Sequence, residues 1–221
     1  MLYDLIASLM RPTAWWGRIR VTGLEALPGD GPVLVVPNHD SQWDPVVIGL
    51  AARPKRRLRY LGRASLWRVP GLAPILNGLR QIPVRRGTGD AGAIESAVEA
   101  LRSGDAVCVF PEGGLSWGEP KRARAGVGRL AQSCPGARVV CCAVAGATGY
   151  MRFPRRPRVE VSFFEPDSGQ PRTGEEPREL AARLLAEVRD RVPPAPAGRR
   201  GRIGPPRRAA RKREATPASR S

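Results

Sequence analysis

The chain has 221 residues, 42% of them hydrophobic, and this content excludes a wholly disordered polypeptide. Its length suits one globular core, because domains usually contain about 100 to 200 residues. Uninterrupted apolar runs stay far below the about 18 to 20 residues that cross a bilayer, so the sequence predicts no transmembrane helix.

The charge is strongly positive, with 37 lysines and arginines against 20 acidic residues and a net charge of +17. This predicts a polyanionic partner: nucleic acid, an anionic membrane or a phosphorylated substrate. Arginine-rich codon usage is the alternative explanation. Residues 193–221 alone hold nine of the basic residues and one of the acidic ones, so about half of the excess lies in this last segment.

The N-terminus has a helical hydrophobic pattern, with Leu2, Leu5, Ile6 and Leu9 on one face. We expect a short amphipathic helix that Pro12 closes. Next come aromatic and basic residues suited to a membrane interface: Arg11, Trp15, Trp16, Arg18 and Arg20. A helix that packs its leucine stripe on the domain explains the pattern equally well.

Four short apolar runs predict buried strands at 33–36, 81–84, 106–110 and 139–144. Helical patterns at 45–52 and 91–102 separate them, the second with Asp90 as N-cap and Gly104 as its stop. Alternating strands and helices predict a single α/β domain with a mostly parallel or mixed sheet flanked by helices.

The C-terminal part of the domain adds a strand at 159–163, whose alternating pattern suggests a half-exposed edge. A last helix at about 176–192 is expected to start with a capping box of Thr173 and Glu176. Prolines and arginines dominate afterwards. We therefore divide the chain into an interfacial segment 1–20, a domain 21–192 and a disordered basic tail 193–221.

The four cysteines have no metal-binding spacing, and three lie inside apolar runs, so neither zinc nor a disulfide framework is expected: Cys108, Cys134, Cys141 and Cys142. Asp4 interrupts the first apolar stretch, and no small-residue cleavage site follows it, so no signal peptide is predicted. These features favour a reducing cytoplasmic location.

Polar or glycine-rich segments follow each of the four predicted strands: 38–44, 85–86, 112–114 and Gly146. In open α/β sheets ligands bind beyond the carboxyl ends of the strands, so we expect these residues to share one cleft.

His39 is the only histidine, and a neutral imidazole can accept and return a proton near neutral pH. Asp44 is its candidate partner, five residues further on. The plainer alternatives are that Asp44 caps the helix beginning at Pro45 and that His39 bonds a loop carbonyl.

Four sequence blocks follow one another in order. They are Asn38, His39 and Asp44; then Ile82, Pro83, Val84 and Arg86; then Phe110, Pro111, Glu112, Gly113 and Ser116; and a strand at 139–146 that ends in glycine. Between the last two blocks stand Arg124, Gly126, Leu130 and Ala131. In residues and spacing, over about 21–147, this set resembles the lysophosphatidic acid (1-acylglycerol-3-phosphate) acyltransferases of the glycerolipid acyltransferase superfamily.

The resemblance implies an O-acyltransferase of phospholipid biosynthesis. His39 would be the general base and Asp44 its support, with Asn38 and Ser116 in supporting positions. The acceptor, a lysophosphatidate or glycerol phosphate, would meet Arg86, Glu112, Gly113, Gly114 and Arg124. The donor would be acyl-CoA or an acyl carrier protein thioester, without a further cofactor or metal. The absence of a GxSxG motif argues against a covalent acyl-enzyme.

The sequence departs from the family pattern at Gly114–Leu115, where Thr-Arg is usual, and at Arg80 and Cys141. Acylation of another lipid or secondary-metabolite hydroxyl therefore stays an alternative. A basic protein that binds anionic membrane or nucleic acid without catalysis is another, although no nucleic-acid motif is present. For the enzyme we expect peripheral association with the inner face of the cell membrane, because both ends carry features that bind anionic lipid.

Overall fold

The computed structural model describes residues 2–85, 91–116, 121–151 and 156–193. Its helices are α1 (Leu2–Trp16), α2 (Asp44–Ala52), α3 (Leu72–Gly78), α4 (Ala91–Arg102), α5 (Gly126–Ser133) and α6 (Pro177–Asp190). Its strands are β1 (Arg20–Thr22), β2 (Val33–Pro37), β3 (Leu58–Arg63), β4 (Ile82–Val84), β5 (Ala106–Cys108), β6 (Arg138–Ala145) and β7 (Glu160–Phe164). Three short 3-10 helices complete the set: η1 (Leu24–Ala26), η2 (Ala64–Arg68) and η3 (Ala147–Gly149).

The seven strands form one sheet in the order β1-β7-β6-β2-β5-β3-β4. Every neighbouring pair is parallel except β6 and β7, which are antiparallel. The prediction of a mostly parallel or mixed sheet in a single α/β domain is confirmed. The carboxyl ends of β2, β3, β4, β5 and β6 consequently meet at one edge of the sheet.

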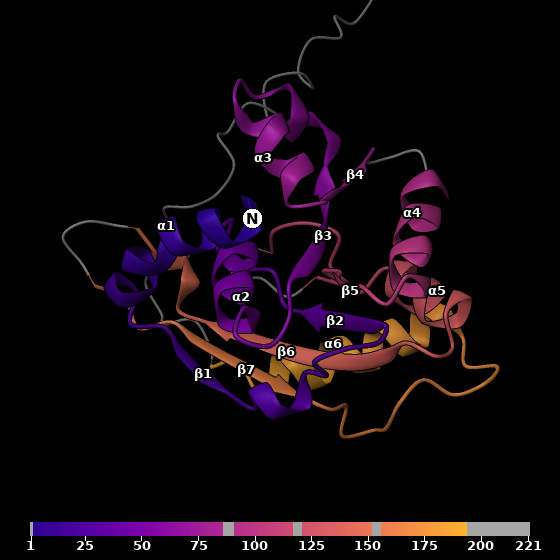
Figure 1. The fold of residues 1–221 in the computed structure, drawn as a ribbon. Helices are drawn as coiled ribbons and strands as arrows, with labels where there is room; N and C mark the ends of the chain where they lie inside the picture. Colours follow the sequence, from indigo (N-terminus) through magenta and orange to yellow (C-terminus); the bar gives the residue numbers. More distant parts are fainter. Residues whose placement is uncertain (1, 86–90, 117–120, 152–155, 194–221) are drawn as a thin grey trace, which may run out of the picture.

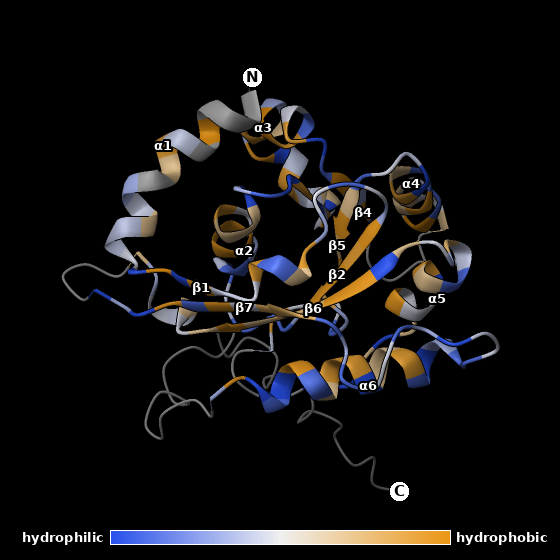
Figure 2. Cartoon of the chain, turned by 60° about the horizontal axis from the view of Figure 1, so that its bottom comes forward, coloured by the Kyte–Doolittle hydropathy of each residue, from blue (hydrophilic) through white to orange (hydrophobic). Residues whose placement is uncertain are grey.

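Helices cover both faces of the sheet (Figure 1). Val33 and Val35 of β2 pack with α2 on one face, and Leu34 and Val36 belong to the core with α4, α5 and α6 on the other. A strand buried on both faces reads as a continuous apolar run instead of an alternating one. Figure 2 shows β2 and β6 as hydrophobic over most of their length.

The N-terminal helix continues past Pro12, so the prediction that Pro12 closes it was wrong. α1 runs on to Trp16 with Pro12 inside it. A proline in a helix removes one backbone donor. Next to it, the Thr13 hydroxyl donates to the Met10 carbonyl oxygen at 2.6 Å. The Thr13 oxygen also accepts from the Tyr150 hydroxyl at 2.8 Å, which ties the end of α1 to the domain.

The predicted strand at 159–163 is β7, but its assignment to the sheet edge was wrong. β1 pairs in parallel with β7 on its outer side, so β7 lies between β1 and β6. All three residues of β1 are exposed, and a strand this short and polar leaves no hydrophobic pattern to find.

The predicted capping box at the start of α6 was also wrong. Glu176 is itself the N-cap, and its carboxylate accepts from the backbone N–H groups of Arg178 and Glu179. Pro177 then occupies the first helical position, where the missing N–H costs nothing. Asp90, the N-cap predicted for α4, and nearly all of the tail 193–221 lie outside the described residues.

Sequence patterns missed β3, α3 and α5 as well as β1. β3 carries two arginines and a glycine in six residues, with one of the six buried. α5 is eight residues long and contains two glycines, which are poor helix formers. Within the described residues, no helix combines the length and apolar character needed to cross a membrane.

Candidate active site

The candidate site lies where β2 and β5 end. Asn38 follows β2 directly, and its buried amide bonds both backbone groups of Val144 in β6, at 2.9 Å to the oxygen and 2.8 Å from the nitrogen. The Ser41 hydroxyl donates to the Ala147 carbonyl oxygen at 3.0 Å. These bonds fasten the loop that carries His39 to the carboxyl end of the neighbouring strand, which gives Asn38 a structural part in the site.

The structure brings the predicted pair together. His39 Nδ1 lies 3.1 Å from Asp44 Oδ2. The same oxygen accepts from the backbone N–H groups of Asp40 at 2.7 Å and Ser41 at 2.8 Å. Asp44 is 1% exposed. A carboxylate held by two amides in this way presents a fixed acceptor to the imidazole.

The alternative that Asp44 caps its helix is wrong. Asp44 is the first residue of α2, the N-cap is Trp43, and no side chain caps this end. The Asp44 carboxylate bonds backwards to the loop 39–41 instead. Burial raises the pKa of the Asp44 carboxyl, and the bonds from His39 and from the Ser41 amide oppose that rise only in part.

The loop after β5 holds His39 from the other side. The His39 backbone N–H donates to Glu112 Oε1 at 3.1 Å, and its carbonyl oxygen accepts from the Ser116 N–H at 2.7 Å. The imidazole stacks on the Phe110 ring with 4.0 Å between centroids. Residue Glu112 as a whole is 2% exposed, so its carboxylate is buried beside the His39 backbone.

Arg189, in the last turn of α6, also reaches this site, and sequence reasoning missed it. Its Nη1 lies 2.9 and 2.7 Å from the two carboxylate oxygens of Asp40, and its Nη2 donates to Glu112 Oε1. A basic residue in a last helical turn is ordinary, because it complements the helix dipole. The sequence held no further signal for Arg189.

Two carboxyl groups beside His39 differ in their pKa. Burial would raise the pKa of Asp40, but bonds from Arg189, Ser116 and Asn38 together lower it. Burial raises the pKa of Glu112, and the charge of Arg189 and the hydrogen bond from the His39 N–H lower it less than burial raises it. The three hydrogen-bond donors to Asp40 keep it ionised.

Three buried polar atoms of the site have no hydrogen-bond partner in the described part of the chain: Asp44 Oδ1, Glu112 Oε2 and Arg189 Nε. Buried polar atoms without partners are rare in folded proteins and need an explanation, such as a catalytic role or a bound water. All three belong to side chains around His39.

Gly113 and Gly114 lie in the turn that follows Glu112. Gly113 has φ +65, and a Cβ there would run into the Arg124 side chain, so Arg124 lies directly over the turn. The Gly113 N–H donates to the Phe110 oxygen at 3.0 Å, and Gly114 is buried. Arg86, the predicted phosphate ligand, lies outside the described residues.

A basic cavity of about 1310 Å³ adjoins the site, between the starts of α4 and α5 and the length of α6. Its basic lining residues are Lys121, Arg122, Arg124, Arg129, Arg178 and Arg189, and its larger apolar ones are Leu61, Val84, Ile94 and Leu185. A lining with both cationic and apolar side chains suits a ligand with both a phosphate group and a hydrocarbon part.

The four cysteines are free and buried. Burial raises the pKa of Cys108 and Cys142 well above the usual value and that of Cys141 to about 12, so these three thiols are poor nucleophiles. No group of three or more His, Cys, Asp or Glu side chains in the described residues could hold a metal ion.

A histidine–carboxylate pair at the carboxyl ends of a mostly parallel sheet is suited to general-base chemistry. The family model described as Acyltransferase matches residues 18–145, and the chain belongs to this family. His39, Asp44 and Glu112 lie inside the matched residues, and Arg189 lies beyond them.

The chain is similar to a curated protein of Bacillus subtilis and to a solved structure from Thermotoga maritima. The "1-acyl-sn-glycerol-3-phosphate acyltransferase" of Bacillus subtilis (strain 168) is 24% identical over 97 residues, or 44% of this chain and 48% of that protein. The chain thus matches about half the length of this relative. The crystal structure of the 1-acyl-sn-glycerophosphate (LPA) acyltransferase PlsC from Thermotoga maritima has a TM-score of 0.64 and 24% identity, over 86% of this chain and 80% of the other. This likeness establishes the fold.

Proposed function

We propose that the protein transfers a fatty acyl chain from a thioester, acyl-CoA or acyl carrier protein, to a hydroxyl of a lysophosphatidate or glycerol phosphate acceptor. The observation that carries this proposal is the contact of His39 Nδ1 with Asp44 Oδ2 at 3.1 Å, in a chain of the acyltransferase family. Because Asp44 accepts the Nδ1 proton, the Nε2 of a neutral His39 is the free base.

In the proposed reaction His39 Nε2 takes the proton of the acceptor hydroxyl as its oxygen forms a bond to the thioester carbonyl carbon. Asp44 stabilises the imidazolium that results, as the carboxylate does in serine hydrolases. The carbon–sulfur bond then breaks, and His39 returns the proton to the leaving sulfur. The products are an ester and a free thiol.

The basic cavity supports a phosphorylated acceptor or donor. Arg124 lies over Gly113 and lines this cavity, so it can bond a phosphate close to the site. Arg86 is the second proposed phosphate ligand. Glu112, Gly113 and Gly114 complete the proposed acceptor site, and Ser116 supports it by bonding the His39 backbone.

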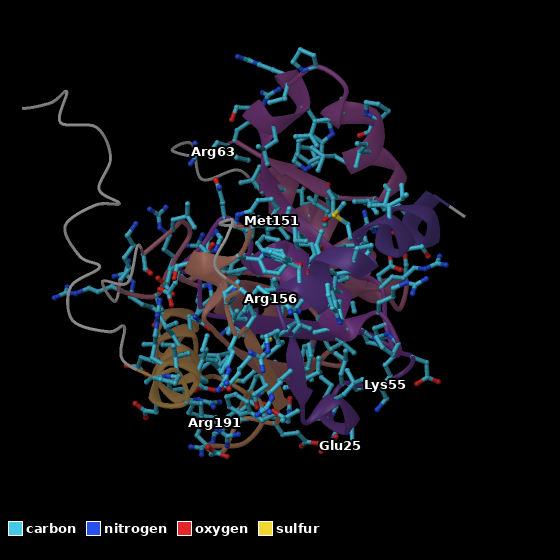
Figure 3. All side chains as sticks on the ribbon, turned by 90° about the vertical axis from the view of Figure 1, so that its left-hand side faces the viewer. Glu25, Lys55, Arg63, Met151, Arg156 and Arg191 are labelled. Atoms are coloured by element: carbon cyan, nitrogen blue, oxygen red, sulfur yellow. The ribbon has the colours of Figure 1, made fainter. Side chains whose placement is uncertain are left out.

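We also propose that the protein works at the surface of an anionic membrane, with α1 in the interface. Leu9 and Trp15 of α1 are 64% and 70% exposed, and Arg156 lies over the Trp15 ring at 4.4 Å. Arg156 is labelled in Figure 3. Exposed apolar and aromatic side chains next to arginine suit the lipid headgroup region.

The test of the proposed reaction is thiol release from a panel of acyl thioesters, with lysophosphatidate, glycerol 3-phosphate, phosphate-free lipid alcohols or no acceptor. We expect release that depends on a phosphorylated acceptor. Arg191→Gln is the control variant. The Arg191 guanidinium of the wild-type chain pairs with Asp167 outside the site, so this substitution should leave the rate unchanged.

Each other outcome overturns part of the proposal. Release without any acceptor identifies a thioesterase. Equal rates with phosphate-free alcohols identify an acyltransferase for another lipid or metabolite. No release with any pair, together with retained binding to anionic vesicles or nucleic acid, identifies a binding protein.

A further inference from the structure

Arg189 joins three segments that are distant in the sequence. It is 149 positions from Asp40 and 77 from Glu112, yet it bonds both. Asp40 belongs to the loop after β2, Glu112 to the loop after β5, and Arg189 to α6. The guanidinium is therefore the point at which the C-terminal helix contacts the two loops around His39.

The two carboxylates that Arg189 bonds are themselves attached to His39. Asp40 is its next neighbour in the chain. Glu112 Oε1 accepts both from the His39 backbone N–H, at 3.1 Å, and from Arg189 Nη2. Ser116 adds a third connection, because its hydroxyl donates to Asp40 and its N–H to the His39 oxygen. A displacement of Arg189 would detach both loops from α6 and, among the described residues, leave only the bonds of Glu112 and Ser116 between them.

The geometry requires a guanidinium. One nitrogen bonds both oxygens of Asp40, and the other bonds Glu112, so the planar fork spans two carboxylates. A lysine ammonium is a single point charge on a flexible stem and lacks this fork. The Arg189 and Asp40 side chains are 17% and 16% exposed and that of Glu112 is 0% exposed, so solvent replaces lost bonds poorly.

We propose that Arg189 is a positioning residue of the acyl-transfer reaction, which fastens the loops after β2 and β5 to α6 and so keeps His39 in its catalytic orientation. This inference rests on the proposed function for its kinetic readout. It assigns a role to α6, which lies beyond the residues that match the family model.

The kinetic test compares Arg189→Gln and Arg189→Lys with the wild-type full chain. A displacement of about 1 Å in a catalytic group can cost about 100-fold in rate. We expect kcat to fall about 10- to 100-fold in Arg189→Gln and less in Arg189→Lys, while KM for donor and acceptor changes by less than about threefold.

Arg183→Gln is the matched control. Arg183 lies on the same helix and forms a partly buried ion pair with Glu175, with 2.5 Å between Nε and Oε1. Its loss should lower the thermal stability of α6 about as much as the loss of Arg189, and it should leave kcat unchanged. The comparison separates a general weakening of α6 from a specific effect on His39.

A second readout does not depend on the reaction. His39 is the only histidine, so a tag-free protein gives one set of imidazole ring-proton signals in an NMR spectrum. The imidazole stacks on the Phe110 ring with 4.0 Å between centroids, so the chemical shifts of its ring protons depend on its orientation over that ring. These chemical shifts should change in Arg189→Gln, and not in Arg183→Gln.

Two results would overturn the role of Arg189. If Arg189→Gln lowers the melting temperature as Arg183→Gln does, with kcat and the imidazole chemical shifts unchanged, Arg189 only anchors α6. If KM rises for phosphorylated acceptors alone and kcat holds, Arg189 is a phosphate ligand. If wild-type protein releases no thiol with any acceptor, the proposed function fails, and the NMR comparison still tests the positioning of His39.

Discussion

One carboxylate oxygen of Asp44 contacts three donors: His39 Nδ1 and the backbone N–H groups of Asp40 and Ser41. A substitution at Asp44 can therefore separate the effect of its negative charge from the effect of its hydrogen bonds. An asparagine oxygen in the same place can accept from the Asp40 and Ser41 amides and from His39, but it carries no charge to stabilise an imidazolium. We expect Asp44→Asn to lower kcat by about 100- to 10,000-fold, the range for general acid–base groups. Its free energy of unfolding should change by about 1–2 kcal/mol, because the backbone bonds remain.

Thiol-release kinetics and urea unfolding measure these two quantities. In the double variant His39→Ala/Asp44→Asn, the second substitution should add little to the first, because the two side chains act as one unit. If Asp44→Asn keeps a rate within threefold of wild type, the role of Asp44 is only to hold the 39–41 loop in its fold.

Asp40 should make the stability of the folded protein depend on pH. Its pKa is lowered in the folded protein from 3.8, so its contribution to stability is present above that pH and is lost as the pH falls through the folded pKa. Asp40→Asn removes this contribution at every pH. Urea unfolding of both proteins between about pH 6 and pH 3 should show a wild-type advantage that shrinks below about pH 4. A constant difference across this range would show that Asp40 is not held ionised by its donors.

At the scale of elements, the contact of α5 with α6 positions the helix that carries Arg189. A Cβ on Gly128 would run into the backbone of Pro177, the first residue of α6. Because backbone cannot turn aside as a side chain can, we expect Gly128→Ala to destabilise the protein by about 1–3 kcal/mol and to lower the acyl-transfer rate.

Gly126→Ala is the control for this contact. Gly126 lies in the same helix, and nothing is within 4 Å of the position of its Cβ, so alanine should be neutral or stabilise α5 by up to about 1 kcal/mol. Thermal unfolding and thiol release measure both variants. Equal stability of the two would mean that α5 and α6 do not need their close approach.

Sequence patterns predicted the elements with the strongest hydrophobic signal. β2 and β6 are buried on both faces and read as continuous apolar runs, and α4 and α6 carry a clear apolar stripe. β1 and β3 gave no such signal, because β1 is exposed and β3 is mostly half-buried and interrupted by arginine and glycine. Their place in the sheet depends on their neighbours more than on their own residues.

In the candidate site too, the residues attached to strongly patterned elements could be predicted from the sequence, and the others could not. His39, Asp44 and Glu112 follow strands that the sequence predicted, so their convergence at one sheet edge could be foreseen. Arg189 could not, because nothing local in α6 distinguishes it from the other arginines of that helix. Its partners Asp40 and Glu112 are brought to it only by the packing of α6 on the sheet.

For the whole molecule, the net charge of +17 and the exposed side chains of α1 predict two separable contributions to membrane binding. Each basic residue near an anionic surface contributes about 1 kcal/mol before salt screens it. Deleting residues 193–221 should weaken binding to anionic vesicles and flatten its salt dependence, and turnover of a soluble short-chain acceptor should not change.

Replacing Trp15 and Trp16 by serine should weaken binding to neutral vesicles as well, because burial of an aromatic ring does not depend on lipid charge. Vesicle sedimentation at several salt concentrations measures both effects. An unchanged affinity and salt slope after deletion of 193–221 would exclude the tail as a membrane tether and would leave nucleic acid, another partner or codon usage to explain its charge.

The central claim is that His39 is the general base of acyl transfer, and the most direct measurement is acceptor-dependent thiol release by His39→Ala. We expect the rate to fall about 100- to 10,000-fold. The free energy of unfolding should change by no more than about 2 kcal/mol, because the imidazole loses only its stack on Phe110 and its bond to Asp44. A folded His39→Ala protein that keeps more than a tenth of the wild-type rate would contradict the account.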